Sequence, residues 1–213
     1  MIIGISGKIG SGKNEVADMI SYLGFRNADG TFNQFKEAQD IRNTFLQNER
    51  WYDAEHTLPN IHSFAANLKK CLAVCTGIDF HKLEDRNVKS SEIPWLGISY
   101  RQLLQQFGEG IRSTVDKNFW VNSLLSQYEN SKTWIISDVR HIVEADAILD
   151  RNGVLIRVNR PGLETGDHIS ETNLDDYQKF TFTIDNDGTL EDLFNKVVKF
   201  FNDLIDYVKV YGK

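Results

Sequence analysis

A glycine-rich loop near the N-terminus constrains the fold of this chain more than any other feature. The loop reads Gly7-Lys8-Ile9-Gly10-Ser11-Gly12-Lys13-Asn14, and it lies between the apolar run Ile2 to Ser6 and a helical pattern of apolar residues. Its spacing matches a Walker A motif, in which backbone N–H groups, a helix N-terminus and a lysine hold nucleotide phosphates. The motif predicts a strand, a phosphate-binding turn and a helix at the start of an α/β core.

We expect all eight residues of this loop to bind ATP. The glycines let the backbone turn sharply, and Lys13 is a candidate catalytic residue that reaches the β- and γ-phosphates. Asn14 stands where Ser or Thr normally supplies a hydroxyl to Mg²⁺. Because an amide oxygen is also a hard ligand, Asn14 is a candidate metal ligand, directly or through water. The alternative is a glycine-rich turn that binds nothing.

Five short apolar runs predict strands, and helical patterns follow most of them. The runs are Ile2 to Ser6, Asn60 to Phe64, Thr133 to Ser137, Val154 to Asn159 and Phe180 to Ile184. Alternation of strands and helices indicates βαβ units and a parallel sheet covered on both faces. The expected fold class is therefore α/β, a three-layer α/β/α core with a five-stranded parallel sheet.

The 213 residues fit one domain with insertions better than two domains. Two connections, at about 24–59 and 81–128, are longer than a plain crossover needs, and we expect the second to cover the substrate. A short lid is expected at about 160–176. The last segment, from Leu190 to Val210, has the apolar stripe of a packing helix.

A second acidic position follows the predicted third strand. Asp138 ends the run Trp134 to Ser137, as an acidic residue does where P-loop enzymes hold Mg²⁺ and its waters. The alternative role for Asp138 is a helix N-cap, because another helical pattern follows it. Phosphoryl transfer also requires cations that neutralise the transferring group, and Arg140, Arg157 and Arg160 are candidates for this role.

Composition limits the partners and the location. The net charge of −6 argues against nucleic-acid binding, which rests on a broad basic patch. No signal peptide or membrane span is visible, so we expect a cytoplasmic protein with no membrane partner. Cys71 and Cys75, the only cysteines, are expected to be buried free thiols on one helix face.

Short sequences along nearly the whole chain resemble the deoxynucleoside monophosphate kinases of bacteriophages, a branch of the P-loop nucleotide kinases. They are the Gly7 to Lys13 loop, Phe64 to Lys69, Tyr100 to Gln105 with Gly108, Arg112 with Trp120-Val121, Ser137 to Arg140 with Glu144, Ile156 to Gly162, His168 to Glu171 and Asn186 to Glu191. Two departures from the family pattern are Asn14-Glu15 after the loop lysine and Gly108-Glu109-Gly110 before Arg112.

The resemblance implies an enzyme that uses Mg²⁺ and ATP to convert a deoxynucleoside monophosphate to its diphosphate. It implies roles for residues outside the glycine loop as well. Lys69, Arg101, Arg112 and Trp120 would bind the substrate, Asp138, Arg140 and Glu144 would lie beside it, Arg157 and Arg160 would serve the lid, and Asn186 to Gly188 would lie near the adenine.

Two other functions stay open from the sequence. One is a P-loop kinase with another small acceptor, such as dephospho-coenzyme A, and the other is a nucleotide-binding module that hydrolyses little. The chain contains no Asn-Lys-x-Asp guanine-reading sequence, which argues against a guanine-nucleotide switch. The preferred base, the strictness for deoxyribose and the formation of a homodimer are not fixed by the sequence.

Overall fold

The computed structural model describes residues 1–23, 61–163 and 172–211, and these form two compact units. The first unit combines the N-terminal segment up to His62 with everything from Asn130 onward, and the second comprises Ser63–Glu129. The expected insertion at 24–59 and much of the expected lid, including His168 and Glu171, lie outside the described residues. The second unit begins at Ser63, upstream of the insertion boundary expected near residue 81.

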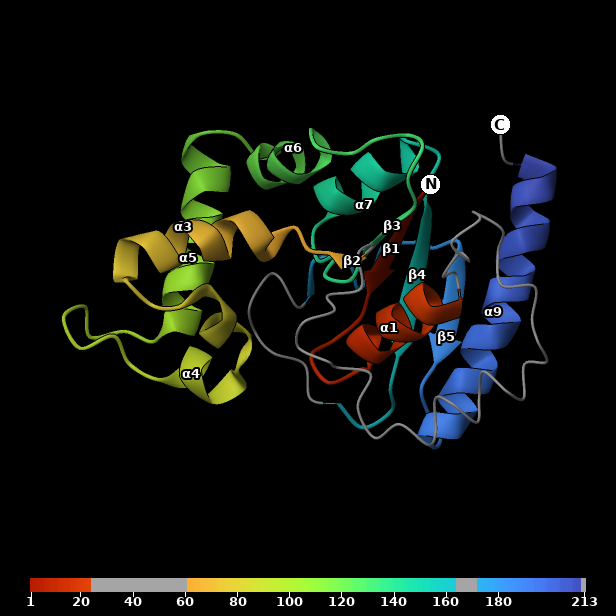
Figure 1. Ribbon diagram of the computed structural model, residues 1–213, viewed down its shortest axis with the longest axis horizontal. Coiled ribbons are helices and arrows are strands. Elements are labelled where there is room, and N and C mark those ends of the chain that lie inside the picture. Colours follow the sequence, from red (N-terminus) through yellow and green to blue (C-terminus); the bar gives the residue numbers. More distant parts are fainter. Residues whose placement is uncertain (24–60, 164–171, 212–213) are drawn as a thin grey trace. The chain divides into compact units, whose positions relative to one another are not determined.

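The described strands of the first unit form one parallel sheet (Figure 1). They are β1 (Ile2–Ser6), β2 (Ile61–His62), β3 (Trp134–Ile136), β4 (Val154–Asn159) and β5 (Phe182–Asp185), in the order β2-β3-β1-β4-β5. In the register, Ile3 of β1 lies opposite Ile135 of β3 and Val154 of β4. The structure confirms the predicted parallel sheet, and every strand lies at one of the five predicted runs. With β1 central, the loop that follows it lies at the carboxyl edge of the sheet.

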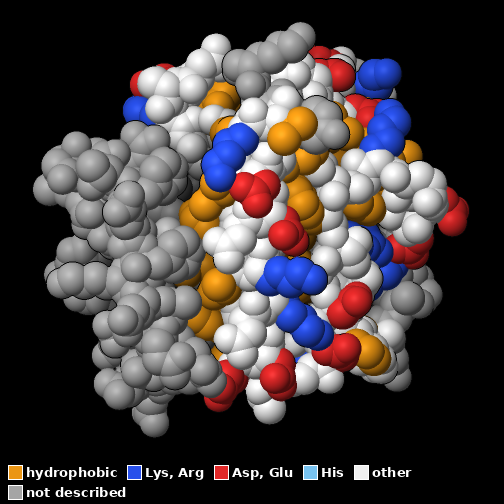
Figure 2. Space-filling model, turned by 90° about the vertical axis from the view of Figure 1, so that its right-hand side faces the viewer, with side chains coloured by type: hydrophobic (Ala, Val, Ile, Leu, Met, Phe, Trp, Pro, Cys, Tyr) orange, Lys and Arg blue, Asp and Glu red, His pale blue; other side chains and the backbone are white. Residues whose placement is uncertain are grey.

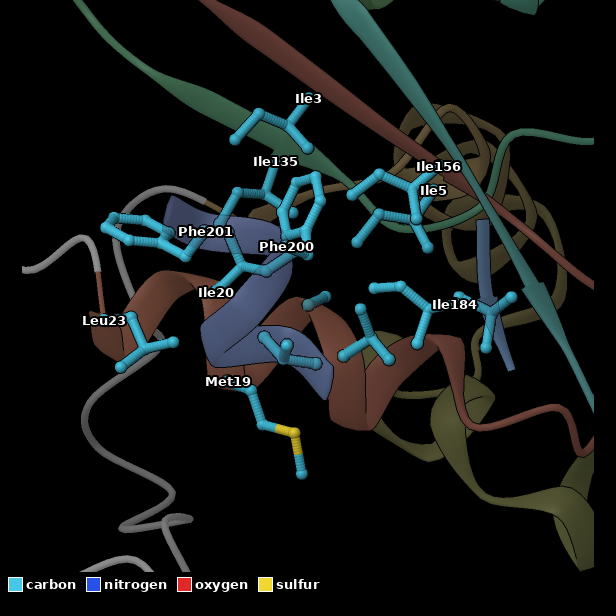
Figure 3. Close-up of a cluster of buried hydrophobic side chains, with 14 of the residues drawn as sticks. Ile3, Ile5, Met19, Ile20, Leu23, Ile135, Ile156, Ile184, Phe200 and Phe201 are labelled. Atoms are coloured by element: carbon cyan, nitrogen blue, oxygen red, sulfur yellow. The ribbon is translucent and has the colours of Figure 1, made fainter. Parts of the chain in front are cut away.

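Two helices, α1 (Lys13–Leu23) and α9 (Leu190–Tyr211), pack against each other and cover one face of the sheet. The apolar residues of α1 recur at Val16, Met19, Ile20 and Leu23, which is the spacing of a buried helical stripe. Figure 3 shows side chains of β1 and α1 meeting Phe200 and Phe201 of α9 in this layer. Truncation of one such side chain to Ala would cost about 2–5 kcal/mol of stability.

Helix α7 (Ile142–Leu149) packs against β1 and β4 from the other face, which completes the three layers. Ile148 and Ala145 of α7 are buried. The carboxylate of Glu144 accepts hydrogen bonds from the N–H groups of Arg140 (2.8 Å) and His141 (3.0 Å), and His141 is the N-cap residue of the helix. This capping arrangement fixes the start of α7, because those N–H groups have no partner within the helix.

The second unit is helical in its described residues. It contains α3 (Ala65–Thr76), a 3₁₀ turn (Phe80–Glu84), α4 (Arg86–Ser90), α5 (Tyr100–Thr114) and α6 (Phe119–Leu125). Helices α5 and α6 both lie within the connection expected at about 81–128. Ser99 and Gln102 form a capping box that begins α5. Helix α3 packs against both α5 and α6.

Cys71 and Cys75 lie on α3 as free thiols, but both are exposed. The expectation of burial was therefore wrong. The residues that α3 buries are Leu68 and Leu72, so the buried stripe of this helix does not include the thiols.

Within the described part of the chain, no helix is long and apolar enough to cross a membrane. On the face drawn in Figure 2, Lys and Arg side chains are interspersed with Asp and Glu side chains and do not gather into one basic patch.

Candidate active site

The glycine loop joins β1 to the first turn of α1. Gly10 and Gly12 have φ values of 84° and 91°, a backbone region that residues with a side chain rarely adopt. The N–H of Ser11 bonds to the carbonyl of Lys8 at 3.1 Å, which closes the turn, and Val16 bonds back to Gly12 as the helix begins. The loop therefore has the compact curvature and the following helix N-terminus that hold phosphate.

Lys13 is the first residue of α1, and its side chain is buried. Its ammonium donates a hydrogen bond to the carbonyl of Lys8 at 3.0 Å, so the side chain folds back over the loop. A cation placed there lies directly against the phosphate-binding turn. Asn14 follows on the exposed side of the helix start.

The loop is braced by Asn186, which follows β5 and is buried. The amide of Asn186 donates a hydrogen bond to the carbonyl of Ser11 at 2.9 Å, and its N–H bonds to the carbonyl of Asn159 at 2.7 Å. A methyl group on Gly12 would lie 2.5 Å from the amide nitrogen of Asn186, so the contact requires glycine there. A methyl group on Gly188 would lie 2.6 Å from the carboxylate of Asp192. Asp192 and Thr189 cap the start of α9 through reciprocal hydrogen bonds.

Asp138 lies just past β3, between the carboxyl ends of two neighbouring strands. The N–H of Ser137 bonds to the carbonyl of His62 in β2, and the N–H of Val139 bonds to the carbonyl of Ile5 in β1, each at 3.1 Å. These bonds hold Asp138 at the same edge of the sheet as the glycine loop. Because α7 begins at Ile142 and has His141 as its N-cap residue, Asp138 is not the helix cap that was considered for it.

Arginines from β4 and from the turn after it reach the same edge. Arg157 donates to the hydroxyl of Ser6 at 3.3 Å, immediately before the loop, and Arg160 donates to the carbonyl of Gly10 at 3.4 Å. Arg140 lies in the turn just before α7, next to the N-cap residue of that helix. Its N–H is held by Glu144, whose side chain is only 2 % exposed. The structure thus gives Glu144 a role in orienting the backbone at Arg140.

A carboxylate from a distant part of the chain joins this group. Asp175 accepts a hydrogen bond from the ammonium of Lys8 at 2.6 Å and one from the guanidinium of Arg157 at 3.1 Å. Burial alone would raise the pKa of Asp175, but the hydrogen bonds and charges of Lys8 and Arg157 outweigh it and lower that pKa. Asp175 is therefore ionised at neutral pH.

The residues at this edge fit a magnesium nucleotide. Among the described residues no group of three or more His, Cys, Asp or Glu could hold a metal ion. Mg²⁺ in kinases needs no such group, because it is held by one or two protein oxygens together with substrate phosphates. The donors available are the Asp138 carboxylate and the Asn14 amide. The Ser11 hydroxyl is buried within the loop and has no hydrogen-bond partner.

The cations expected at the acceptor lie in the second unit. Lys69 on α3 forms a 2.7 Å ion pair with Glu84, and Arg112 on α5 lies 3.9 Å from Glu109. Arg101 and Arg112 are separated by three helical turns, so they share one face of α5 and their Cα atoms lie about 16 Å apart. The two guanidinium groups would therefore contact different parts of an acceptor.

Gly108 lies on that same face of α5, where a methyl group would approach Leu68 of α3 to 3.1 Å. The side chain of Trp120 is 3 % exposed, and its ring nitrogen donates to the carbonyl of Gly108 at 3.0 Å. Phe107 and Phe119 pack around its ring. Trp120 therefore has a structural position in this unit, where it fixes α6 against α5.

Sequence reasoning missed Asp175, which no motif includes, and it missed the link from Asn186 to Ser11. Sequence spacing gives no signal for either contact, because the partners are separated by 167 and 175 residues. The remaining predicted residues of the first unit, from the glycine loop to Arg160, converge on the carboxyl edge of the sheet. In open α/β sheets this edge is where ligands bind.

A parallel sheet of this order, a Walker-type loop after its central strand and cations at its carboxyl edge define a P-loop kinase core. The comparisons with known proteins narrow this class. Residues 39–197 match the deoxynucleotide monophosphate kinase family. The chain belongs to this family. The matched residues begin after the glycine loop, so the loop is an independent observation.

Three relatives carry the same name. A protein of Acanthamoeba polyphaga mimivirus, provisionally named deoxynucleotide monophosphate kinase, is 28% identical over 159 residues, which covers 64% of this chain and 79% of that protein. The deoxynucleotide monophosphate kinase of Enterobacteria phage T4 is 32% identical over 127 residues, covering 56% of this chain and 51% of its own length. That of Escherichia phage RB69 is 29% identical over 108 residues, covering 47% and 44%. The match thus spans about half the length of the two phage relatives.

Proposed function

We propose that this protein transfers the γ-phosphoryl group of ATP to a deoxynucleoside monophosphate and releases ADP and the deoxynucleoside diphosphate. The observation that carries the proposal is the geometry of the glycine loop, with Lys13 folded over a turn that leads into a helix N-terminus. Membership of the deoxynucleotide monophosphate kinase family supports the acceptor, since the relatives are named for it. We propose that the enzyme acts in the cytoplasm, which is the host's if a phage encodes it.

The glycine loop would bind the β- and γ-phosphates through backbone N–H groups and through Lys13. The transferring phosphoryl group carries its charge on peripheral oxygens, so catalysis consists of positioning and charge neutralisation. Arg140, Arg157 and Arg160 lie at the same edge of the sheet and would supply that neutralisation. Arg140 precedes α7, whereas Arg157 and Arg160 lie at the end of β4 and just after it, so the arginines would approach the transferring group from two segments.

The acceptor needs no general base. A phosphate monoester has a second pKa of about 6 and is largely dianionic at neutral pH, so one of its oxygens attacks phosphorus directly. Asp138 and Asn14 would hold Mg²⁺, which when bound screens the charge of the β- and γ-phosphates. Asp138 therefore does not need to accept a proton.

We propose that the helical unit Ser63–Glu129 binds the acceptor. Lys69, Arg101 and Arg112 give it three cations, and an acceptor phosphate is bound strongly by charge-assisted hydrogen bonds. Because Arg101 and Arg112 are three turns apart, we assign the acceptor phosphate to Arg112 and Lys69 and leave Arg101 for the rest of the nucleotide.

The test is an acceptor panel. Purified protein is incubated with labelled ATP and, separately, with each deoxynucleoside monophosphate, each ribonucleoside monophosphate, each nucleoside and dephospho-coenzyme A. The proposal predicts diphosphate formation from at least one deoxynucleoside monophosphate and none from nucleosides, which lack the phosphate group that the acceptor cations would bind. Turnover of dephospho-coenzyme A alone would show that this compound, and not a deoxynucleoside monophosphate, is the acceptor. Absence of turnover with all acceptors would favour a nucleotide-binding module.

A further inference from the structure

Asp175 connects two cations that come from different segments of the phosphate edge. Lys8 belongs to the glycine loop, and Arg157 belongs to the end of β4. The carboxylate of Asp175 accepts from both, one on each oxygen, at 2.6 and 3.1 Å. The two cationic side chains are each only 17% exposed, and that of Asp175 is 38% exposed. Because both cations are largely buried, removing the carboxylate should cost more than removing one partner of an exposed ion pair.

The segment that carries Asp175 is anchored on both sides of this residue. Before it, the amide oxygen of Asn173 accepts from the N–H of Ile142 at 2.9 Å, and the side chain of Leu174 is buried. After it, the hydroxyl of Tyr177 donates to Asp146 of α7 at 2.7 Å. These contacts fix the backbone at Asp175 relative to α7. The backbone that carries the carboxylate is therefore held by contacts other than those with Lys8 and Arg157.

Arg157 is constrained from three directions. One terminal nitrogen donates to Ser6, the other donates to Asp175, and the guanidinium carbon lies 5.5 Å from the centre of the Phe180 ring. An arginine side chain loses rotamer entropy when it is ordered. Contacts of this kind order the Arg157 side chain before substrate binds, so its rotamer entropy does not have to be lost during the reaction. These contacts thus preorganise the guanidinium group.

We propose that Asp175 is a positioning residue that orients Lys8 and Arg157 toward the phosphates in the ligand-free enzyme. This inference rests on the proposed phosphoryl transfer and assigns a function to a residue that no motif includes. Asp175 itself does not touch the transferring group. It acts through Arg157, and it links the glycine loop to the last residues of the predicted lid.

The first experiment compares Asp175→Asn with Asp176→Asn, which removes the same charge from the next, exposed residue. Asp175→Asn should lower kcat for the deoxynucleoside monophosphate reaction about tenfold and change its acceptor KM less than twofold, because an interaction used in the transition state is lost. Asp176→Asn should stay within twofold of the unmodified enzyme. Asp175→Glu, which keeps the carboxylate, should recover part of kcat.

A double-mutant cycle shows whether Asp175 acts through Arg157. Arg157→Gln should lower kcat, and adding Asp175→Asn to it should lower kcat no further. If the fold-losses in kcat of the two single variants multiply in the double variant, Asp175 and Arg157 act independently, and the inference is overturned. Asp175→Ser removes the same carboxylate and takes the place of Asp175→Asn in the cycle if that variant does not fold.

Three further outcomes are distinguishable. If the unmodified enzyme phosphorylates a deoxynucleoside monophosphate but Asp175→Asn behaves like Asp176→Asn, the positioning role fails and the proposed function stands. If Asp175→Asn lowers the KM for ATP, the carboxylate competes with phosphate and does not position its partners. If the unmodified enzyme has no kinase activity, the proposed function fails, and the inference fails with it.

Discussion

The side-chain amide of Asn186 donates a hydrogen bond to the carbonyl of Ser11 and so joins the end of the last strand to the glycine loop. Asn186 is buried and is held in turn by the carbonyl of Asn159. The resemblance to phage kinases implies that Asn186 lies near the adenine. The structure shows a contact that would act on the phosphate-binding turn instead, whichever base the nucleotide carries.

Asn186→Ala should therefore weaken the binding of all triphosphates equally. Loss of a neutral hydrogen bond of about 1 kcal/mol corresponds to about fivefold in affinity. Calorimetric titration with ATP, GTP and inorganic tripolyphosphate measures this directly. Asn159→Ala, at an exposed position on the neighbouring strand, is the control and should change each affinity less. A loss confined to ATP would favour an adenine contact.

Asp18 should make the folded protein less stable at neutral pH. Burial, and secondly the charge of Glu15, raises the pKa of Asp18 to about 6. In the unfolded chain an Asp has a pKa near 3.9, so between these values the folded state binds more protons and stability falls as pH rises. Protonated Asp18 makes its full contribution to the free energy of unfolding below about pH 4, and this contribution is lost above about pH 6.

Asp18→Asn should raise the free energy of unfolding by about 1 kcal/mol near pH 7.5, since solvent screens part of the full pKa effect. Near pH 4 the variant and the unmodified protein should be equally stable. Urea unfolding at the two pH values provides the measurement. Glu15→Gln should give a smaller gain in the same direction. A gain of equal size at both pH values would contradict the account.

Asp138→Asn should remove most Mg²⁺-dependent turnover, on the order of 10²-fold or more, without loss of ADP binding in the absence of Mg²⁺. The position of Asp138 beside the carboxyl ends of β1 and β2 supports this prediction. Asp203→Asn, at an exposed site on α9, is the matched control. A lowered melting temperature with normal kinetics would instead assign Asp138 a purely structural role.

Arg112→Ala should raise the KM for the deoxynucleoside monophosphate about tenfold or more, because an acceptor phosphate loses a charge-assisted hydrogen bond. The affinity for ATP should remain nearly unchanged, since the glycine loop is a separate set of contacts. Steady-state kinetics with each substrate varied in turn separate the two effects. Arg86→Ala on α4 is an exposed control. A defect limited to ATP would show that the acceptor site is misplaced.

The strands could be predicted closely because each is a short apolar run between turn residues. β4 has the predicted bounds, whereas β2 is only two residues long although the apolar run is longer. The start of α7 was less clear from the pattern of apolar residues. Asp138 is a good N-cap type, but His141 and Glu144 cap the helix, and that choice depends on where β3 ends.

The candidate site was predictable where residues follow the ends of strands, because parallel strands bring their carboxyl ends to one edge. Residues in the helical unit could be placed only by resemblance. The burial of Trp120 against Gly108 and the exposure of Cys71 follow from how α3, α5 and α6 pack, which local periodicity does not specify. Asp175 shows the same limit, since its role depends on contacts with residues far away in the sequence.

Lys13 provides the most direct test of phosphoryl transfer by the glycine loop. Transfer from ATP labelled at the γ-phosphorus to a deoxynucleoside monophosphate is measured for the unmodified protein, Lys13→Ala and Lys199→Ala, an exposed lysine on α9. We predict labelled deoxynucleoside diphosphate from the unmodified protein and from Lys199→Ala, and a loss on the order of 10²-fold or more for Lys13→Ala with its fold intact. A folded Lys13→Ala variant that transfers the label at the unmodified rate would contradict this account.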